Sequence, residues 1–123
     1  MKQICPGIDI IEIQRIREAL AAWGHRFLHR IYTAREAELY GDSVDSLAVR
    51  FAGKEAVFKV LSKPGIYLSW QDIEILSAED GRPEVQLSGE ALKRAGELGI
   101  RSLEISLSHS RDNAVAVVIG LAE

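Results

Sequence analysis

The sequence predicts an α+β fold in which a mainly antiparallel sheet packs against a long central helix. Two observations support this class. The stretch that ends at Leu61 is apolar almost all the way round a helix, which is typical of a buried helix. The remaining patterns follow in the order strand, helices, hairpin, helix and hairpin, as in α+β domains. The 123 residues, 47% of them hydrophobic and 27% charged, fit a single domain over residues 1–123.

The first half begins with a strand and continues with helices. Residues 4–12 predict a strand, because isoleucine recurs in a nearly continuous apolar run. Residues 13–23 carry apolar side chains at helical spacing, and Gly24 ends that helix. A short helix is expected around residues 25–31. The sequence from Thr33 to Glu36 is a capping-box pattern that starts a third helix.

The central helix has clear signals at both ends. Either Ser43 or Asp45 can cap its N-terminus. The helix runs to about Leu61, and Pro64-Gly65 prevents it from continuing.

The second half predicts two hairpins separated by one amphipathic helix. Ser88 is expected to cap that helix, and Gly99 closes it. The strands are expected at Asp72–Ser77, Glu84–Leu87, Leu103–Leu107 and Ala114–Ile119, with turns at Glu79–Pro83 and Ser108–Asn113.

Composition narrows the class of protein. A net charge of −3 argues against a general nucleic-acid binder. The longest apolar run, Ala114–Ala122, is far shorter than the roughly 20 residues of a membrane span, and no signal peptide is expected. The single cysteine, Cys5, cannot pair within the chain, which suits a reducing cytoplasm. We therefore expect a cytoplasmic protein without a membrane or nucleic-acid partner.

Positive charge is concentrated in one segment. Between Arg15 and Arg35 lie five arginines and two histidines against a single acid, Glu18. Such a segment on an acidic protein indicates an acidic partner or ligand. A solvated helix face is the alternative interpretation.

Two acids occur in apolar surroundings. Glu55 and Lys59 lie one turn apart on the central helix, and a surface ion pair worth about 0.2–0.5 kcal/mol is one interpretation. Asp9, however, lies in the apolar run of the first strand. Two buried acids are costly unless they share a cation. Carboxylates without a His or Cys cluster favour Mg²⁺ over Zn²⁺, and Mg²⁺ is usually completed by substrate phosphates.

Other polar residues have two interpretations each. Lys59 would supply a point charge for a phosphate beside Glu55. Arg50 precedes Glu55 by about 1.4 turns and would reach only a long ligand. Gly81-Arg82-Pro83 is explained by hairpin turn chemistry or by a ligand contact. His109, next to Ser108, is either structural or a contact for a phosphate or ribose.

The ordered motifs resemble those of the small bacterial holo-acyl-carrier-protein synthases, and they extend across almost the whole chain. In sequence order they are Gly7-Ile8-Asp9-Ile10 with Ile13, Arg15 and Ile16; Phe27, Arg30-Ile31-Tyr32-Thr33 and Glu36; Arg50-Phe51-Ala52, Lys54-Glu55-Ala56 and Lys59; Ser69-Trp70 and Asp72-Ile73-Glu74-Ile75; Gly81-Arg82-Pro83; and Ser106-Leu107-Ser108-His109-Ser110.

The resemblance implies a 4′-phosphopantetheinyl transferase fold and activity. Such enzymes move the phosphopantetheine arm of coenzyme A onto a serine of an apo acyl carrier protein and release 3′,5′-ADP. The family typically forms a homotrimer with active sites between subunits. The resemblance implies Mg²⁺ ligation by Asp9 and Glu55, a place for Lys59 near the transferred phosphate, docking of the acidic carrier on Arg15, and coenzyme A contacts at Arg50, Gly81, Arg82, Pro83, Ser108 and His109.

The residues leave several points open. The base that takes the serine proton is either Glu55 through a metal-bound water or Lys59 in its neutral form. The chain also departs from the family, because Lys63-Pro64-Gly65 replaces the usual glycine-rich loop after the long helix. A non-catalytic module that binds coenzyme A or the carrier is therefore the alternative function, and a metal-dependent pyrophosphate hydrolase is a more remote one.

Overall fold

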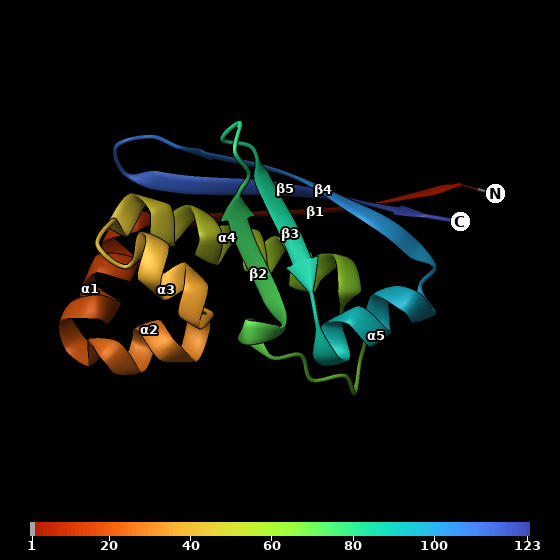
Figure 1. Cartoon of the computed structure of the whole chain (residues 1–123), viewed down its shortest axis with the longest axis horizontal. Coiled ribbons are helices and arrows are strands. Elements are labelled where there is room, and N and C mark those ends of the chain that lie inside the picture. The colour runs from red at the N-terminus through yellow and green to blue at the C-terminus, as the bar shows by residue number, and fades with distance from the viewer. Residues whose placement is uncertain (1) are drawn as a thin grey trace.

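A three-stranded antiparallel sheet and one long helix form the centre of the fold (Figure 1). The computed structural model describes residues 2–123, so Met1 lies outside the described residues. The sheet has the order β1 (Gln3–Glu12), β5 (Asn113–Ala122), β4 (Ile100–His109), and α4 (Val44–Leu61) packs against it. This confirms the predicted class, a mainly antiparallel sheet on a long central helix.

The other elements surround α4. The helices α1 (Ile13–Trp23), α2 (His25–Ile31) and α3 (Ala34–Tyr40) cover one end of it, and α5 (Gly89–Glu97) lies towards the other end (Figure 1). A second antiparallel sheet, the hairpin of β2 (Ile73–Ser77) and β3 (Pro83–Leu87), crosses α4 after the short 3-10 helix η1 (Trp70–Asp72).

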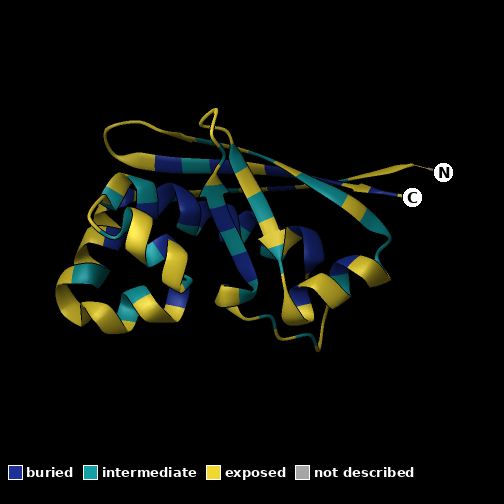
Figure 2. Ribbon diagram, viewed as in Figure 1, coloured by how far each residue is buried: buried dark blue, intermediate teal, exposed yellow. Residues whose placement is uncertain are grey.

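The long helix is buried along most of its length (Figure 2). It approaches β1 closely, because a Cβ atom on Gly7 would lie 2.2 Å from the carbonyl oxygen of Ala56. Only glycine allows this contact, and it brings the C-terminal half of α4 against the middle of β1. Asp9, two residues after Gly7 in the same strand, is therefore held next to α4.

Local capping signals correctly predicted where α3 and α4 begin. Thr33 and Glu36 form the capping box, with Glu36 N donating to Thr33 Oγ1 at 3.2 Å and Thr33 N donating to Glu36 Oε1 at 2.9 Å. Of the two caps considered for α4, Ser43 accepts a hydrogen bond from Ser46 N, so Ser43 is the cap.

Three predicted details are wrong. Asp72 belongs to η1, and the strand begins at Ile73. Ser88 occupies the N-cap position of α5, but its side chain makes no capping hydrogen bond. The last two strands are longer than predicted and are joined by residues 110–112, so Ser108 and His109 lie in β4 rather than in the turn, because backbone pairing continues to His109 opposite Ala114.

Two further features complete the description. The segment after α4 carries the unusual Lys63-Pro64-Gly65 sequence and is exposed to solvent, with Gly65 at a φ of 84°. In the described part of the chain, every helix is too short or too polar to span a lipid bilayer.

Candidate active site

The acid of the first strand and the lysine of the central helix lie against each other. Lys59 Nζ is 3.1 Å from Asp9 Oδ1 and donates a hydrogen bond of 2.7 Å to the carbonyl oxygen of Ile8. The side chain of Asp9 is 18% exposed and that of Lys59 is 53% exposed. The pair is therefore fixed to the backbone of β1 on one side and partly exposed on the other.

Glu55 belongs to the same site. It precedes Lys59 by one helical turn, so both side chains point to the same side of α4. Burial raises the pKa of Glu55, the carboxylate of Asp9 raises it further, and the ammonium of Lys59 opposes both effects. Because Lys59 contacts Asp9 and lies one turn from Glu55, the two carboxyl groups share one neighbourhood. The structure thus brings Asp9, Glu55 and Lys59 together, and their catalytic and metal-binding roles stay predictions.

The donor set of this site fits a hard cation that is held partly by its substrate. Within residues 2–123, no group of three or more His, Cys, Asp or Glu side chains is placed to hold a metal ion. Mg²⁺ usually binds one or two carboxylates, keeps several waters and takes its remaining ligands from phosphate oxygens. Asp9 and Glu55 supply those two carboxylates, so a phosphate-bearing substrate would complete the coordination.

Aromatic rings lie on α4 next to Glu55. The ring of Trp70 from η1 stacks on Phe51 at a centroid distance of 4.9 Å and meets the ring of Phe58 nearly edge-on at 4.8 Å. Phe51 and Phe58 flank Glu55 on the same helix face. We call these three residues, Phe51, Phe58 and Trp70, the aromatic wall.

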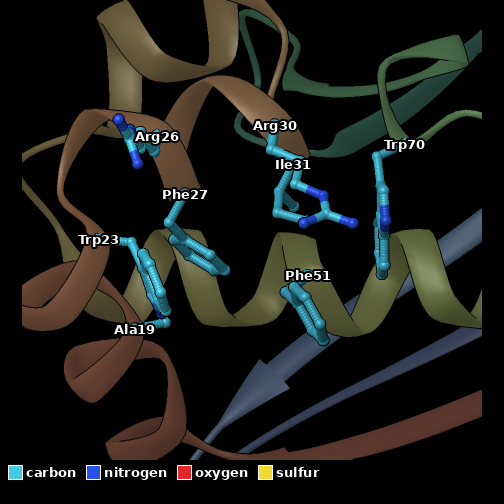
Figure 3. Close-up of a pocket in the computed structure, with 8 residues that line it drawn as sticks. All are labelled: Ala19, Trp23, Arg26, Phe27, Arg30, Ile31, Phe51 and Trp70. Carbon is cyan, nitrogen blue, oxygen red and sulfur yellow. The ribbon is translucent and has the colours of Figure 1, made fainter.

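The aromatic wall also borders a pocket between α1, α2 and α4 (Figure 3). The pocket has a volume of about 570 Å³ and lies over α4 on the side of the basic segment. Arg26 and Arg30 line it, with the guanidinium of Arg30 pointing towards Trp70, while its apolar walls come from Trp23, Phe27, Ile31, Phe51 and Trp70. An apolar pocket with two cations beside it suits an apolar side chain on an acidic partner.

The predicted docking residue Arg15 is exposed on α1, outside the lining of this pocket. Within residues 2–123, the five arginines of the basic segment form no ion pair with an acid. Their charges are therefore free to attract an acidic partner.

Arg50 is tied into the protein instead of lying open at the site. Its Nε donates to the carbonyl oxygen of Ile75 at 2.8 Å, its Nη1 donates to the carbonyl oxygen of Ser46, and its Nη2 donates to Ser77 Oγ. The guanidinium also lies 3.5 Å from the ring centroid of Tyr40, and Arg50 is only 4% exposed. Its structural role is to connect α4 with β2 and α3, and its predicted contact with coenzyme A gains no support from this geometry.

The other predicted coenzyme A contacts lie on exposed edges. Gly81 and Arg82 form the exposed tip of the β2–β3 hairpin, Pro83 begins β3, and the φ of Gly81 is 88°. Asp9 and Leu107 are both paired with Ala116, so β4 lies two strands from β1, about 10 Å away across the sheet.

Ser108 and His109 are exposed, and as neighbours in β4 they point to opposite faces of the sheet. His109 is on the face of Asp9, and Ser108 is on the outer face, away from α4. One chain therefore does not bring Ser108 into the acid site.

The outer face of β1 and β5 is apolar and uncovered, whereas the outward residues of β4 are polar. Ile4, Ile8 and Ile10 alternate with inward residues along β1 and are 59–68% exposed, and Val117 and Leu121 of β5 are 37% and 41% exposed. A contiguous exposed apolar patch of this kind marks an interaction surface.

Sequence reasoning missed the structural importance of three residues, Glu36, Lys54 and Trp70. Glu36 and Lys54 form an ion pair at 2.6 Å in which both side chains are fully buried. Burial lowers the pKa of Lys54, and the carboxylate of Glu36 opposes this effect. The available signal was a lysine on a largely apolar helix, but its partner, 18 positions earlier in the sequence, could not be identified by spacing.

Comparison with known proteins identifies the superfamily of this chain. The family model of the 4′-phosphopantetheinyl transferase superfamily matches residues 6–118. The chain belongs to this superfamily. Two proteins with similar sequences are named holo-[acyl-carrier-protein] synthase. The protein from Dehalococcoides mccartyi is 52% identical, with 92% of this chain and 94% of the relative covered, and that from Herpetosiphon aurantiacus is 43% identical, with 94% and 96% covered.

A solved phosphopantetheinyl transferase structure shares the fold. The holo-[acyl-carrier-protein] synthase of Helicobacter pylori, solved in complex with coenzyme A, superposes with a TM-score of 0.82 at 37% identity and covers 94% of this chain and 98% of its own. The superfamily membership and the predicted fold class are thus confirmed.

Proposed function

We propose that the chain is a holo-acyl-carrier-protein synthase, which transfers the 4′-phosphopantetheine arm of coenzyme A to a serine of an apo acyl carrier protein. The observation that carries this proposal is the meeting of Asp9, Glu55 and Lys59 at one open site. Relatives of 43–52% identity bear this name, and the Helicobacter pylori relative was solved with coenzyme A.

The reaction is a phosphoryl transfer in which ion binding, phosphate binding and proton acceptance would be assigned to the residues of this site. The serine oxygen forms a bond to the β-phosphorus of coenzyme A, the bond to the bridging oxygen breaks, and 3′,5′-ADP leaves. Bound Mg²⁺ would polarise the phosphoryl group and neutralise charge. Asp9 and Glu55 would hold this ion, and Lys59 would place its ammonium beside the transferred phosphate. The serine proton would pass either to Glu55 through a metal-bound water or to Lys59, which would then have to be neutral instead of an ammonium.

Coenzyme A contacts are proposed at residues from separate parts of the fold. Gly81, Arg82 and Pro83 would hold the nucleotide end at the hairpin tip, and Ser108 and His109 would contact it from the end of β4. Arg50 would act indirectly, by holding α4 against β2 near this hairpin. Because Ser108 faces away from the acids of its own chain, its contribution fits a site shared between subunits.

A homotrimer would supply such shared sites. The support is the outer face of the sheet, where Ile4, Ile8 and Ile10 are largely exposed in the single chain. Burying this face against a second copy removes apolar surface from water, which is the dominant favourable contribution in most protein association. Since β1 carries both the outer isoleucines and Asp9, assembly on this face would place the acid site close to a subunit boundary.

The carrier protein would dock on the basic segment. Arg15, Arg26 and Arg30 present free positive charge, and the pocket beside the aromatic wall accepts an apolar side chain. An acidic amphipathic helix offers both features to one surface. We further place the protein in the cytoplasm, because its only cysteine, Cys5, is free.

One assay tests the proposed function. Apo carrier protein, coenzyme A and Mg²⁺ are incubated with the chain, and intact-mass spectrometry follows the carrier. A mass gain of one phosphopantetheine arm with equimolar 3′,5′-ADP is expected. Binding of coenzyme A without any mass gain would instead indicate a binding module, and 3′,5′-ADP release without a carrier would indicate a hydrolase.

A further inference from the structure

The ion pair between Glu36 and Lys54 is the most deeply buried charged feature of the chain within residues 2–123. The carboxylate of Glu36 also accepts hydrogen bonds from the backbone N–H groups of Thr33 at 2.9 Å and Ile75 at 2.8 Å. A buried ion pair is generally no more stabilising than apolar side chains of the same volume. Stability alone therefore does not explain why two charges occupy this core position.

The geometry of Lys54 suggests what the pair provides. Its ammonium donates to the carbonyl oxygens of Trp70 and Ile73, which lie at the start of η1 and just after its end. An apolar side chain at position 54 could make neither bond. Lys54 thus fastens η1 to the side of α4, and Glu36 holds the ammonium in place.

The segment fastened in this way carries one wall of the proposed active site. The ring of Trp70 lies against Phe51 and Phe58, the two aromatic residues that flank Glu55 on α4 (Figure 3 shows Trp70 and Phe51 side by side). Lys54 itself is the immediate neighbour of Glu55 in the sequence. Lys54 therefore holds the backbone of Trp70 from inside the core. The next residue, Glu55, is flanked along α4 by the two phenylalanines that the ring of Trp70 contacts.

We propose that Trp70 is a positioning residue of the transfer reaction and that the buried Glu36–Lys54 pair is the clamp that holds it. The inference rests on the proposed function. A fixed aromatic wall keeps water from one side of the Glu55 carboxylate, and electrostatic interactions are stronger where water is excluded. It also restricts the rings of Phe51 and Phe58, so that Glu55 keeps one orientation while the substrates bind.

The first arm of the test is kinetic and uses two variants. Trp70→Leu removes the ring, and the double variant Glu36→Gln/Lys54→Met removes the clamp without leaving a lone buried charge. Both are expected to lower kcat about tenfold or more while the KM for coenzyme A stays unchanged. Trp70 also borders the pocket proposed for the carrier. A rise in the carrier KM alone, with kcat unchanged, would assign Trp70 to docking and overturn the inference.

Arg94→Met is the matched control, because it also removes a largely buried cation that donates to a backbone carbonyl oxygen. Arg94 Nε donates to the carbonyl oxygen of Leu61 at 2.8 Å, and its side chain is 11% exposed. Its hydrogen bond and its ion pair are made to Leu61, at the C-terminal end of α4, and to Glu97, instead of to η1. This variant is expected to lose some stability but to keep kcat, and an equal loss of kcat would mean that any weakening of α4 has the same effect.

The second arm is spectroscopic and separates the clamp from a general loss of fold. The chain has two tryptophans, so Trp23→Phe leaves Trp70 as the only indole. In this background, the double variant Glu36→Gln/Lys54→Met is expected to shift Trp70 emission to longer wavelength and to increase its quenching by acrylamide, whereas Arg94→Met should not. An unchanged Trp70 spectrum in the double variant would overturn the clamp.

The outcomes also distinguish this inference from the proposed function. If the unmodified chain produces no holo carrier, the proposed function is wrong and the inference is wrong with it. If the unmodified chain transfers normally and the Trp70 and clamp variants keep its kcat, only the inference is overturned.

Discussion

Lys59 and Asp9 join the central helix to the first strand, with 3.1 Å between Nζ and Oδ1. The contact connects residues 50 positions apart in the sequence. In the absence of a metal, the ammonium of Lys59 partly neutralises the paired acids. A bound divalent cation would take over this function and leave Lys59 to the phosphate.

Removing either acid should abolish transfer without unfolding the chain. Asp9→Ala and Glu55→Ala are expected to lower kcat/KM by about a hundredfold or more, because each removes a proposed ligand of the ion that stabilises the transition state. The assay is carrier mass gain over a Mg²⁺ series, with circular dichroism to check the fold. Glu12→Gln, an exposed acid of the same strand, is the control. Wild-type turnover in either acid variant would show that the metal assignment is wrong.

Stability should depend on pH through Glu55. Its pKa is raised above the ordinary value of 4.5, so the folded chain binds this proton more tightly than the unfolded chain. The stabilising contribution of Glu55 is therefore fully present below about pH 4.5 and is lost as pH rises through the raised pKa.

The variant Glu55→Gln removes this dependence. In the presence of a chelator, the free energy of unfolding of this variant should rise relative to that of the wild type as pH rises from 4.5 towards neutrality. Urea unfolding at a series of pH values measures the difference, with Glu12→Gln treated in the same way. A difference that stays constant with pH would show that the Asp9 carboxylate and burial do not perturb Glu55.

The basic segment should govern carrier binding. Arg15→Glu is expected to raise the KM for the carrier more than the KM for coenzyme A, and the carrier KM should rise with salt. Lys93→Glu makes the same charge change on the exposed side of α5 and serves as the control. Equal effects of Arg15→Glu on both substrates would argue against docking on α1.

Charge on the outer face of the sheet should prevent assembly. Ile8→Asp and Ile10→Asp place a carboxylate among the exposed apolar side chains of β1, where burial against another copy would require desolvation of that charge. Light scattering coupled to size exclusion should report the mass of three chains for the wild type and of one chain for these variants. Leu39→Asp, at a 57% exposed position of α3, should not change the mass. A wild-type mass of one chain would be inconsistent with the trimer.

Removing one partner of the buried Glu36–Lys54 pair should strongly lower the free energy of unfolding. Lys54→Met leaves the fully buried carboxylate of Glu36 without its cation, which typically costs about 3–5 kcal/mol. Arg82→Met breaks the exposed pair with Asp80, whose side chains are 85% and 66% exposed, and should cost less than about 1 kcal/mol. Equilibrium urea unfolding compares the two losses, and similar values would mean that the Glu36–Lys54 pair is not a strong contact.

Much of the fold could be predicted because its signals are local. The capping box at Thr33 and the helical spacing that ends at Gly24 depend on residues a few positions apart, and both were read correctly. The meeting of Asp9 and Glu55 is not local. It was predicted from the energetic argument that two acids in apolar elements need a common cation and from the family resemblance, because residue spacing gives no sign of it.

The remaining features depend on tertiary contacts that spacing does not encode. Arg50 looked available to a long ligand, but the carbonyl oxygen of Ile75 and the ring of Tyr40 hold it. Ser108 and His109 looked like turn residues, because serine and histidine are not typical of a strand. Pairing with β5 nevertheless extends β4 through both of them, and the pleat separates their side chains.

Alternate residues of β1 face in opposite directions, with Asp9 towards α4 and Ile8 and Ile10 away from it. A strand of this kind tolerates changes of side chain better than changes of length. One residue inserted between Gly7 and Ile8 would turn the carboxylate of Asp9 outward and the side chains of Ile8 and Ile10 inward. A single-codon insertion would thus remove the chemistry and the subunit contact in the same event, although neither residue type had been replaced.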